Sequence, residues 1–416
     1  MHAPDRSLNP FRVLRAHRNF RLFWIGQTLS LIGSWMQTMA LGWLALQLSN
    51  SALIVGLVAS IGALPVLLFS MHAGALVDRS DRLMVVRVTQ TIFLVQAATL
   101  WFLAWQGHAT ITLLLILSCV QGLASAIEIP ARQSMIILLV GPEDLHPAIA
   151  LNSSGFNLAR IVGPAIGGLV IHRFGIAWCF GVNALSFVAV LWSLWLIQLP
   201  KTPSPFVGTR LWDVMRNSTH DAVAGLRHLD QPGVVRDLLG LVSVGAVFGT
   251  PFVILMPVIA RDQLHLDAGG YGGLLAALGI GGLFGALIIA GPAAHWARGR
   301  VMRATSLLYP LLSIALALST DVRTAHMLLF GIGVALIMFN AVSNGVLQLR
   351  TPEEFRGRLM AFYSMVVVGV SQAVGALALG AVARAVGVEW AVGASAFLTL
   401  AFAVWTFMRS PELARV

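Results

Sequence analysis

The segment Gly74-Ala-Leu-Val-Asp-Arg-Ser-Asp-Arg82 contains four charged residues among its nine. Apolar runs flank it at residues 51–75 and 84–106. Each run exceeds the length of about 18 residues that an α-helix needs to cross a hydrocarbon core of about 30 Å. A short charged loop between two such runs predicts a turn at a membrane surface.

Composition extends this prediction to the whole chain. Charged residues make up 11% of the 416 positions and hydrophobic residues 57%, whereas a soluble globular chain is about a quarter charged. The apolar runs are continuous and lack the alternation of barrel strands, so we expect spanning helices. The formal charge of +10 comes from arginines in short loops between spans, which membrane insertion explains. We therefore expect a lipid bilayer around the chain and no nucleic-acid partner.

The sequence lacks the residue patterns that several kinds of enzyme and cofactor site require. Lys201 is the only lysine, and no P-loop contains it, so ATP hydrolysis is excluded. Cys119 and Cys179 both fall inside predicted spans, which leaves no disulfide framework and no CxxC metal spacing. HExxH and GxSxG patterns are absent as well. We expect no enzyme activity, no metal and no cofactor.

Twelve helices are predicted, in an all-α membrane protein of two six-helix bundles. The first bundle occupies residues 1–199 and the second residues 237–416, with a cytoplasmic linker at 200–236 that holds an amphipathic helix. The first apolar run, about residues 20–48, is too long for a signal-peptide core of about 7 to 15 residues. The predicted spans are 20–47, 51–75, 84–106, 110–131, 147–171, 176–199, 237–260, 270–293, 302–319, 325–348, 359–383 and 388–408.

Basic residues predict the orientation. With both termini in the cytoplasm, 22 of the 27 Lys and Arg residues lie on cytoplasmic segments. Four lie outside, namely Arg173, Arg261, Arg323 and Arg384, and Arg160 lies within a span. Cytoplasmic loops of membrane proteins are enriched in Lys and Arg, so we expect a multi-pass protein of the bacterial inner membrane with cytoplasmic termini.

The two halves share sequence as well as helix number. Gly163-Pro-Ala-Ile-Gly-Gly168 recurs 212 residues later as Gly375-Ala-Leu-Ala-Leu-Gly380, and the following Gly/Trp patterns also correspond. Gly74-Ala-Leu recurs as Gly285-Ala-Leu. Internal repeats of this kind are typical of transporters, so a duplicated six-helix unit is predicted.

The loop at residues 74–82 resembles the G-x-L-x-D-R-x-G-R signature of the major facilitator superfamily, with Asp81 in place of the second glycine. In that family the aspartate caps a helix of the opposite half, and the second arginine pairs with an acid on the fourth helix to hold the cytoplasmic side shut. The resemblance assigns these roles to Asp78, Arg82 and Glu128. The alternative is that the charges of the loop serve membrane insertion alone.

The fifth helix carries Gly163-Pro-Ala-Ile-Gly167-Gly168, which resembles the antiporter signature G-x-x-x-G-P-x-x-G-G of the same superfamily. Small residues at 159, 163 and 167 form one close-packing face, and Pro164 permits a bend. We expect this face to pack on Gly281 and Gly285 of the eighth helix, as a seam on which the halves rock. Dense packing without a role in coupling is the alternative.

The fourth helix lacks the arginine of the family's R-x-x-Q-G signature, because Ser118-Cys-Val-Gln121-Gly122 stands there. Over its full length the chain is similar to the branch that contains the enterobactin and macrolide exporters. The nearest likeness lies in Pro130-Ala-Arg132-Gln133 and in residues 152–168.

Polar side chains recur at helical spacing on three spans, and in lipid such stripes must face protein or water. In the family, the first, fourth and tenth helices line the central cavity. We therefore expect the substrate cavity at these stripes together with Trp35, with helix-to-helix hydrogen bonding as the alternative. The proposed cavity residues are Gln27, Ser30, Ser34, Trp35, Gln37, Gln121, Ser125, Asn340 and Asn344.

Glu128 and Arg160 are ionisable residues well inside spans, where a charge costs at least about 2.5 kcal/mol on insertion scales. If the fourth helix stops near Arg132, Glu128 pairs with Arg82 or Arg132 as a gate. If it continues through residues 135–140, Glu128 is as deep as Arg160 and could meet it. A buried carboxyl group next to an exchangeable arginine can also carry a proton.

The sequence thus predicts a monomeric secondary transporter that exports small amphipathic molecules, drug-like or siderophore-like, by proton antiport and alternating access. An importer or a lysolipid flippase with the same fold is one alternative, since fold alone does not fix function. A membrane receptor or assembly factor that transports nothing is another.

Overall fold

The computed structural model describes residues 11–77, 80–198 and 233–415. Asp78 and most of the predicted linker with its amphipathic helix lie outside these ranges. Within them the regular structure is entirely helical, and twelve helices are long and apolar enough to span a membrane. The all-α membrane fold expected from the sequence is confirmed.

The N-terminal half begins with a short helix and continues with six long ones. Their starts are fixed by side-chain caps in two cases: Asp81 accepts hydrogen bonds from the amides of Leu83 and Met84, and Thr110 accepts one from Leu113. The helices are α1 (Arg12–Ala16), α2 (Arg18–Ser49), α3 (Ala52–Val77), α4 (Arg82–Trp105), α5 (Ile111–Val140), α6 (Leu145–Phe174) and α7 (Ala177–Trp195).

The C-terminal half is less regular. Its first span consists of α9 (Val234–Val244), a π-helical segment η2 (Gly245–Gly249), η3 (Pro251–Val253), α10 (Met256–Val258) and a second π-helical segment η4 (Ile259–Gln263). The eleventh span likewise contains a π-helical segment, η6 (Met365–Gly375), between α14 (Glu353–Ser364) and α15 (Ala376–Val386). The remaining elements are α11 (Ala268–Ala290), η5 (Pro292–His295), α12 (Arg298–Leu318), α13 (Val322–Arg350), α16 (Val388–Arg409) and η7 (Pro411–Arg415).

Aspartates cap two helices of this half. Asp267 accepts from the amide of Gly270 at the start of α11, and Asp321 accepts from the amide of Thr324 at the start of α13. The hydrogen bonds from Thr324 hold the pKa of Asp321 below its usual value.

The fourth span is longer than predicted. The sequence placed its end near residue 131, next to Pro130, whereas α5 continues to Val140. A proline inside a membrane helix is tolerated where neighbouring helices satisfy the freed backbone group. Glu128 is therefore 12 residues from the end of α5, and Arg160 is 15 residues from the start of α6. The two residues lie at comparable depth, as in the alternative in which the helix continues through residues 135–140, and Arg132 lies inside the span.

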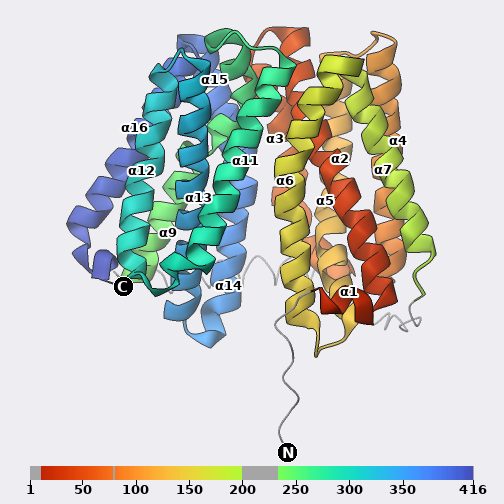
Figure 1. The fold of residues 1–416 in the computed structure, drawn as a ribbon, viewed down its shortest axis with the longest axis horizontal. Coiled ribbons are helices and arrows are strands. Elements are labelled where there is room, and N and C mark those ends of the chain that lie inside the picture. Colours follow the sequence, from red (N-terminus) through yellow and green to blue (C-terminus); the bar gives the residue numbers. More distant parts are fainter. Residues whose placement is uncertain (1–10, 78–79, 199–232, 416) are drawn as a thin grey trace, which may run out of the picture.

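Helices α1–α7 and α9–α16 form two bundles that stand side by side (Figure 1). Helix α1 and the C-terminal segment η7 lie at the same end of the molecule, here called the termini end; the opposite end is the far end. Large apolar side chains are exposed on the outside, among them Trp192, Met327, Trp390 and Met408. Such a surface is unfavourable in water and suits lipid contact.

The buried core shows where the halves join. One cluster combines residues of both halves, for example Met39 and Trp43 with Phe252 and Tyr271. A second cluster contains only residues 13–197, and a third only residues 238–413. The shared cluster occupies the far end, and the separate clusters occupy the termini end. The halves are thus packed together at the far end and have independent cores at the termini end.

Candidate functional site: a cleft between the two halves

Side-chain contacts close the far end. Trp43 of α2 stacks on Tyr271 of α11, with ring centroids 5.7 Å apart and planes at 17°. Arg261 donates to the Asn50 side chain at 2.8 Å and to the Leu46 carbonyl at 3.4 Å. These contacts join α2 of the N-terminal half to the C-terminal half.

Further contacts close the same end around them. His172 of α6 lies 3.5 Å from Asp267, the cap of α11. The backbones approach closely as well: a Cβ atom on Gly272 would lie 2.9 Å from the Gly168 Cα, and one on Gly56 would lie 2.4 Å from the Ala376 carbonyl oxygen. Glycine is required at these crossings because any side chain would force the halves apart.

The junction between α6 and α11 ends at Arg160. One face of α6 carries Ser153, Asn157, Arg160, Pro164 and Gly168 at steps of four, three, four and four. Gly168 and Pro164 touch Gly272, and the Arg160 guanidinium lies beside Gly282, 3.7 Å from the position of a Cβ there. On the same face nearer the termini end, Asn157 and Ser153 are exposed. The halves therefore part just below Arg160, and a cleft opens toward the termini end.

Arg160 stands at the closed apex of this cleft. Within the described ranges it makes no ion pair and no hydrogen bond, and its side chain is half-buried. Phe156, one turn below it on α6, packs edge-on against Trp35 of α2, with ring centroids 5.7 Å apart. An unpaired guanidinium next to two aromatic rings can bind an acidic, partly aromatic molecule.

Glu128 forms a buried ion pair inside the N-terminal half. Its Oε1 atom lies 3.0 Å from the Arg132 Nε, one turn along α5, and 3.5 Å from the Gln90 Nε2 of α4. Glu128 and Arg132 are 5% and 8% exposed. The Arg132 Nε lies at ion-pair distance but lacks hydrogen-bond alignment. Among the partners that the sequence suggested for Glu128, Arg132 lies at ion-pair distance. Arg160 does not pair with Glu128.

One predicted cavity residue, Gln37, is hydrogen-bonded inside the N-terminal bundle instead. Gln37 donates to Gln96 and Gln121 at 3.0 and 3.3 Å and accepts from Asn183 at 2.8 Å. Gln27 and Ser30 are also buried, at 4% and 2% exposure. The assignment of Gln37 to the cavity was wrong, because neighbouring helices satisfy its side chain and it joins α2 to α4, α5 and α7. The assignment of Gln27, Ser30 and Gln121 stays a prediction.

The other predicted cavity residues are partly accessible. Ser34, Trp35 and Ser125 are half-buried, as are Asn340 and Asn344 of α13. Asn344 hydrogen-bonds to Gln348 and to Tyr363. Assignment of these five residues to the cavity stays a prediction.

The glycine seam differs from the predicted one. Gly163 and Gly167 pack on α2, where a Cβ on Gly163 would lie 2.7 Å from the Trp35 Cβ, and Gly281 and Gly285 pack on α13. The predicted pairing of these faces across the halves was wrong, since the glycines serve packing within each half. The contact between the fifth and eighth helices exists, but Pro164, Gly168, Gly272, Gly279 and Gly282 make it.

Some site residues escaped the sequence reasoning. Asp81, which replaces the second glycine of the loop signature, caps α4, and Arg82 is the first residue of that helix. Ser153 and Asn157 share a face with Arg160, and their spacing of four and three residues was a readable signal.

Known transporters resemble this chain in sequence. The enterobactin exporter EntS of Shigella flexneri is 26% identical over 411 residues, covering 97% of this chain and 94% of the relative. A staphyloferrin A transporter of Staphylococcus aureus is 25% identical over 272 residues, covering 65% of this chain and 66% of the relative.

Solved structures show the same fold. A bacterial homologue of the human lysosomal transporter Spinster, in an inward-facing and unoccupied conformation, has a TM-score of 0.73 at 15% identity and covers 97% of this chain and 98% of that one. The nucleoside transporter NupG has a TM-score of 0.65 at 14% identity, covering 94% and 98%.

The two bundles and the cleft between them define a multi-pass membrane transporter of the major facilitator superfamily. The family model of the transmembrane secretion effectors matches residues 7–415, so the chain belongs to that family. The resemblance to the enterobactin exporter branch, inferred from the sequence, is confirmed.

Proposed function

We propose that this transporter exports small, acidic amphipathic molecules of the siderophore type, and that proton influx drives the export by alternating access. The chain works as a monomer in the bacterial inner membrane with both termini in the cytoplasm, so that the cleft faces the cytoplasm. The observation that carries the proposal is Arg160, a cation at the apex of the cleft where the two halves part, with no ion-pair partner among the described residues.

The substrate class follows from the chemistry of the apex. A guanidinium without a counter-ion at membrane depth is costly, and an acidic ligand offsets that cost. Trp35 and Phe156 add aromatic surface within one helical turn. The relatives support the same substrate class, because one is named as an exporter of enterobactin and the other as a transporter of staphyloferrin A, and both compounds are siderophores.

Glu128 is the proposed proton carrier. Among the acidic residues that the structure describes, Glu128 is the one far from both ends of its span, 17 residues after Ile111 and 12 before Val140. Protonation of the carboxylate would release Arg132, and deprotonation would restore the ion pair. Both residues lie on α5, so protonation of Glu128 would change the charge inside the N-terminal half while the two halves move relative to each other.

Transport by everted membrane vesicles tests the proposal. With an acidic interior, vesicles that contain the chain should accumulate a siderophore, and collapse of the pH gradient should abolish accumulation. Macrolides and lysolipids serve as competing substrates. Accumulation of lysolipid alone would indicate a flippase, uptake only under the reversed gradient would indicate an importer, and binding without movement would indicate a receptor or assembly factor.

A further inference from the structure

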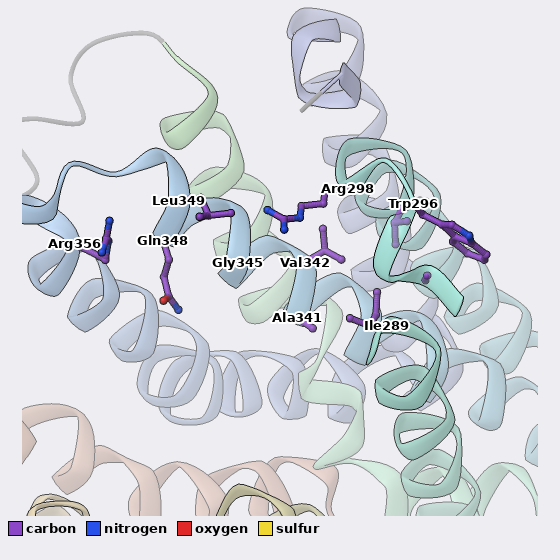
Figure 2. A pocket seen from close by; sticks show the side chains of 11 residues that line it. Ile289, Trp296, Arg298, Ala341, Val342, Gly345, Gln348, Leu349 and Arg356 are labelled. Carbon is purple, nitrogen blue, oxygen red and sulfur yellow. The ribbon is translucent and has the colours of Figure 1, made fainter. Parts of the chain in front are cut away.

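A second cavity lies in the C-terminal half, away from Arg160. It has a volume of about 510 Å³ and opens between the termini-end parts of α11, α12, α13 and α14. Figure 2 shows Arg298 extending from the start of α12 toward α13, with Gln348 and Arg356 lining another side. Most other lining residues are apolar, including Ile289, Val342 and Leu349.

The two arginines of this cavity lack strong partners. Arg298 makes no ion pair or hydrogen bond within the described ranges. Among the described residues one acid lies near Arg356, namely Glu353 at 4.0 Å, whose side chain is 92% exposed, and such pairs are weak. The Arg356 Nε is buried, and no described group accepts a hydrogen bond from it. Within the described part of the chain, the positive charge of the cavity therefore has only this weak counter-ion.

Comparison of the duplicated halves supports this conclusion. In the N-terminal half, Asp81 caps α4 immediately before Arg82. In the C-terminal half, α12 begins at Arg298 after Ala297, with no side-chain cap and no acid in its first turn. Arginines at a helix N-terminus are unfavourable unless an anion is present. The start of α12 thus lacks an acid like the one that caps α4.

The position of the cavity relates it to the cleft. Ile289 lies seven residues beyond Gly282 on α11, on the same helical face, which corresponds to about 10 Å along the helix. Gly282 lies beside Arg160. A molecule that entered from the termini end would meet Arg298 and Arg356 before it reached Arg160.

We propose that this cavity is a docking site for the acidic group of a soluble amphipathic anion, with Arg298 and Arg356 binding the anionic oxygens and Ile289, Val342 and Leu349 contacting its apolar body. The site captures the anion at the mouth of the cleft before the anion moves to Arg160. The statement that this anion is the transported substrate rests on the proposed function. Its test uses binding alone and needs no proton gradient.

The test is equilibrium binding of dansyl-glycine, a fluorescent carboxylate, to the purified chain carrying Arg160→Ala, which removes the cation at the apex. We expect binding, and a loss of about tenfold in affinity when Arg298→Gln and Arg356→Gln are combined. The matched control combines Arg300→Gln and Arg303→Gln, which removes the same charge from α12 outside the cavity; we expect less than about a twofold change there. Dansyl-glycinamide, the uncharged analogue, should bind weakly and equally to all variants.

Three results would overturn the proposal. One is binding of the carboxylate that does not exceed that of the amide, and another is an equal loss in the control variant. The third is displacement of the probe by dihexanoyl phosphatidylglycerol far more strongly than by hexyl phosphate, an amphipathic anion without the lipid headgroup, which would assign the cavity to that headgroup. None of these results bears on proton-driven transport, which Glu128→Gln tests separately.

Discussion

The indole of Trp43 lies on the ring of Tyr271, 5.7 Å between centroids, and this contact spans the two halves at the far end. An aromatic pair of this kind contributes about 0.5 to 1.5 kcal/mol beyond the area that it buries. Trp43 and Tyr271 are 6% and 4% exposed. The stack therefore favours the conformation in which the far end is closed.

Trp43→Ala should shift the chain toward conformations with an open far end, by up to about tenfold in population. The distance between spin labels at His108→Cys and Thr320→Cys, which are both in far-end loops, would measure the shift in a chain where Cys119 and Cys179 are replaced by alanine. A longer distance population should grow in the variant. An unchanged distribution would show that the stack does not hold the far end closed.

Gly272→Ala should act in the same direction through backbone contact. The new Cβ atom would lie 2.9 Å from both the Gly168 Cα and the Pro164 carbonyl oxygen, and overpacking of this kind costs about 1 to 3 kcal/mol. Gly393→Ala is the control, since its Cβ would lie 3.7 Å from its nearest neighbour, Ala317. The same pair of spin labels reports the outcome, and equal distances in both variants would refute the assignment.

The sequence predicted the helical spans well because length and hydropathy are local properties, as with α4 and α16. It could not predict which way a polar stripe faces. Gln37 and Asn340 lie on equally plausible stripes, but Gln37 is buried by Gln96 and Asn183, which are distant in sequence. The packing partners of the glycines could not be predicted for the same reason. Gly281 could pack on either neighbour of α11, and only the fold shows that it packs on α13.

Asn183→Ala should lower stability without changing substrate affinity. The substitution leaves the Gln37 Oε1 without its donor at 2.8 Å, and hydrogen bonds between membrane helices contribute about 0.6 kcal/mol on average. Thermal unfolding in detergent measures the stability, and ligand titration measures the affinity. A clear loss of affinity at unchanged stability would show that Gln37 contributes to the substrate cavity.

Arg160→Ala should weaken binding of acidic ligands by about tenfold and leave uncharged analogues of the same ligands almost unaffected. Arg160→Lys should recover part of the affinity, because it retains the charge but loses the planar fork of donors. Equilibrium binding of an acidic ligand and its amide would separate the two effects. If both ligands lost affinity equally, Arg160 would have a structural role.

Coupling of export to proton influx through Glu128 can be tested with Glu128→Gln in proteoliposomes. The glutamine retains the shape of the side chain but cannot exchange a proton, so we predict loss of pH-driven uptake with substrate exchange across the membrane preserved. Wild-type chain in the same vesicles is the reference for both activities. Uptake driven by the pH gradient at the wild-type rate in Glu128→Gln would contradict the account.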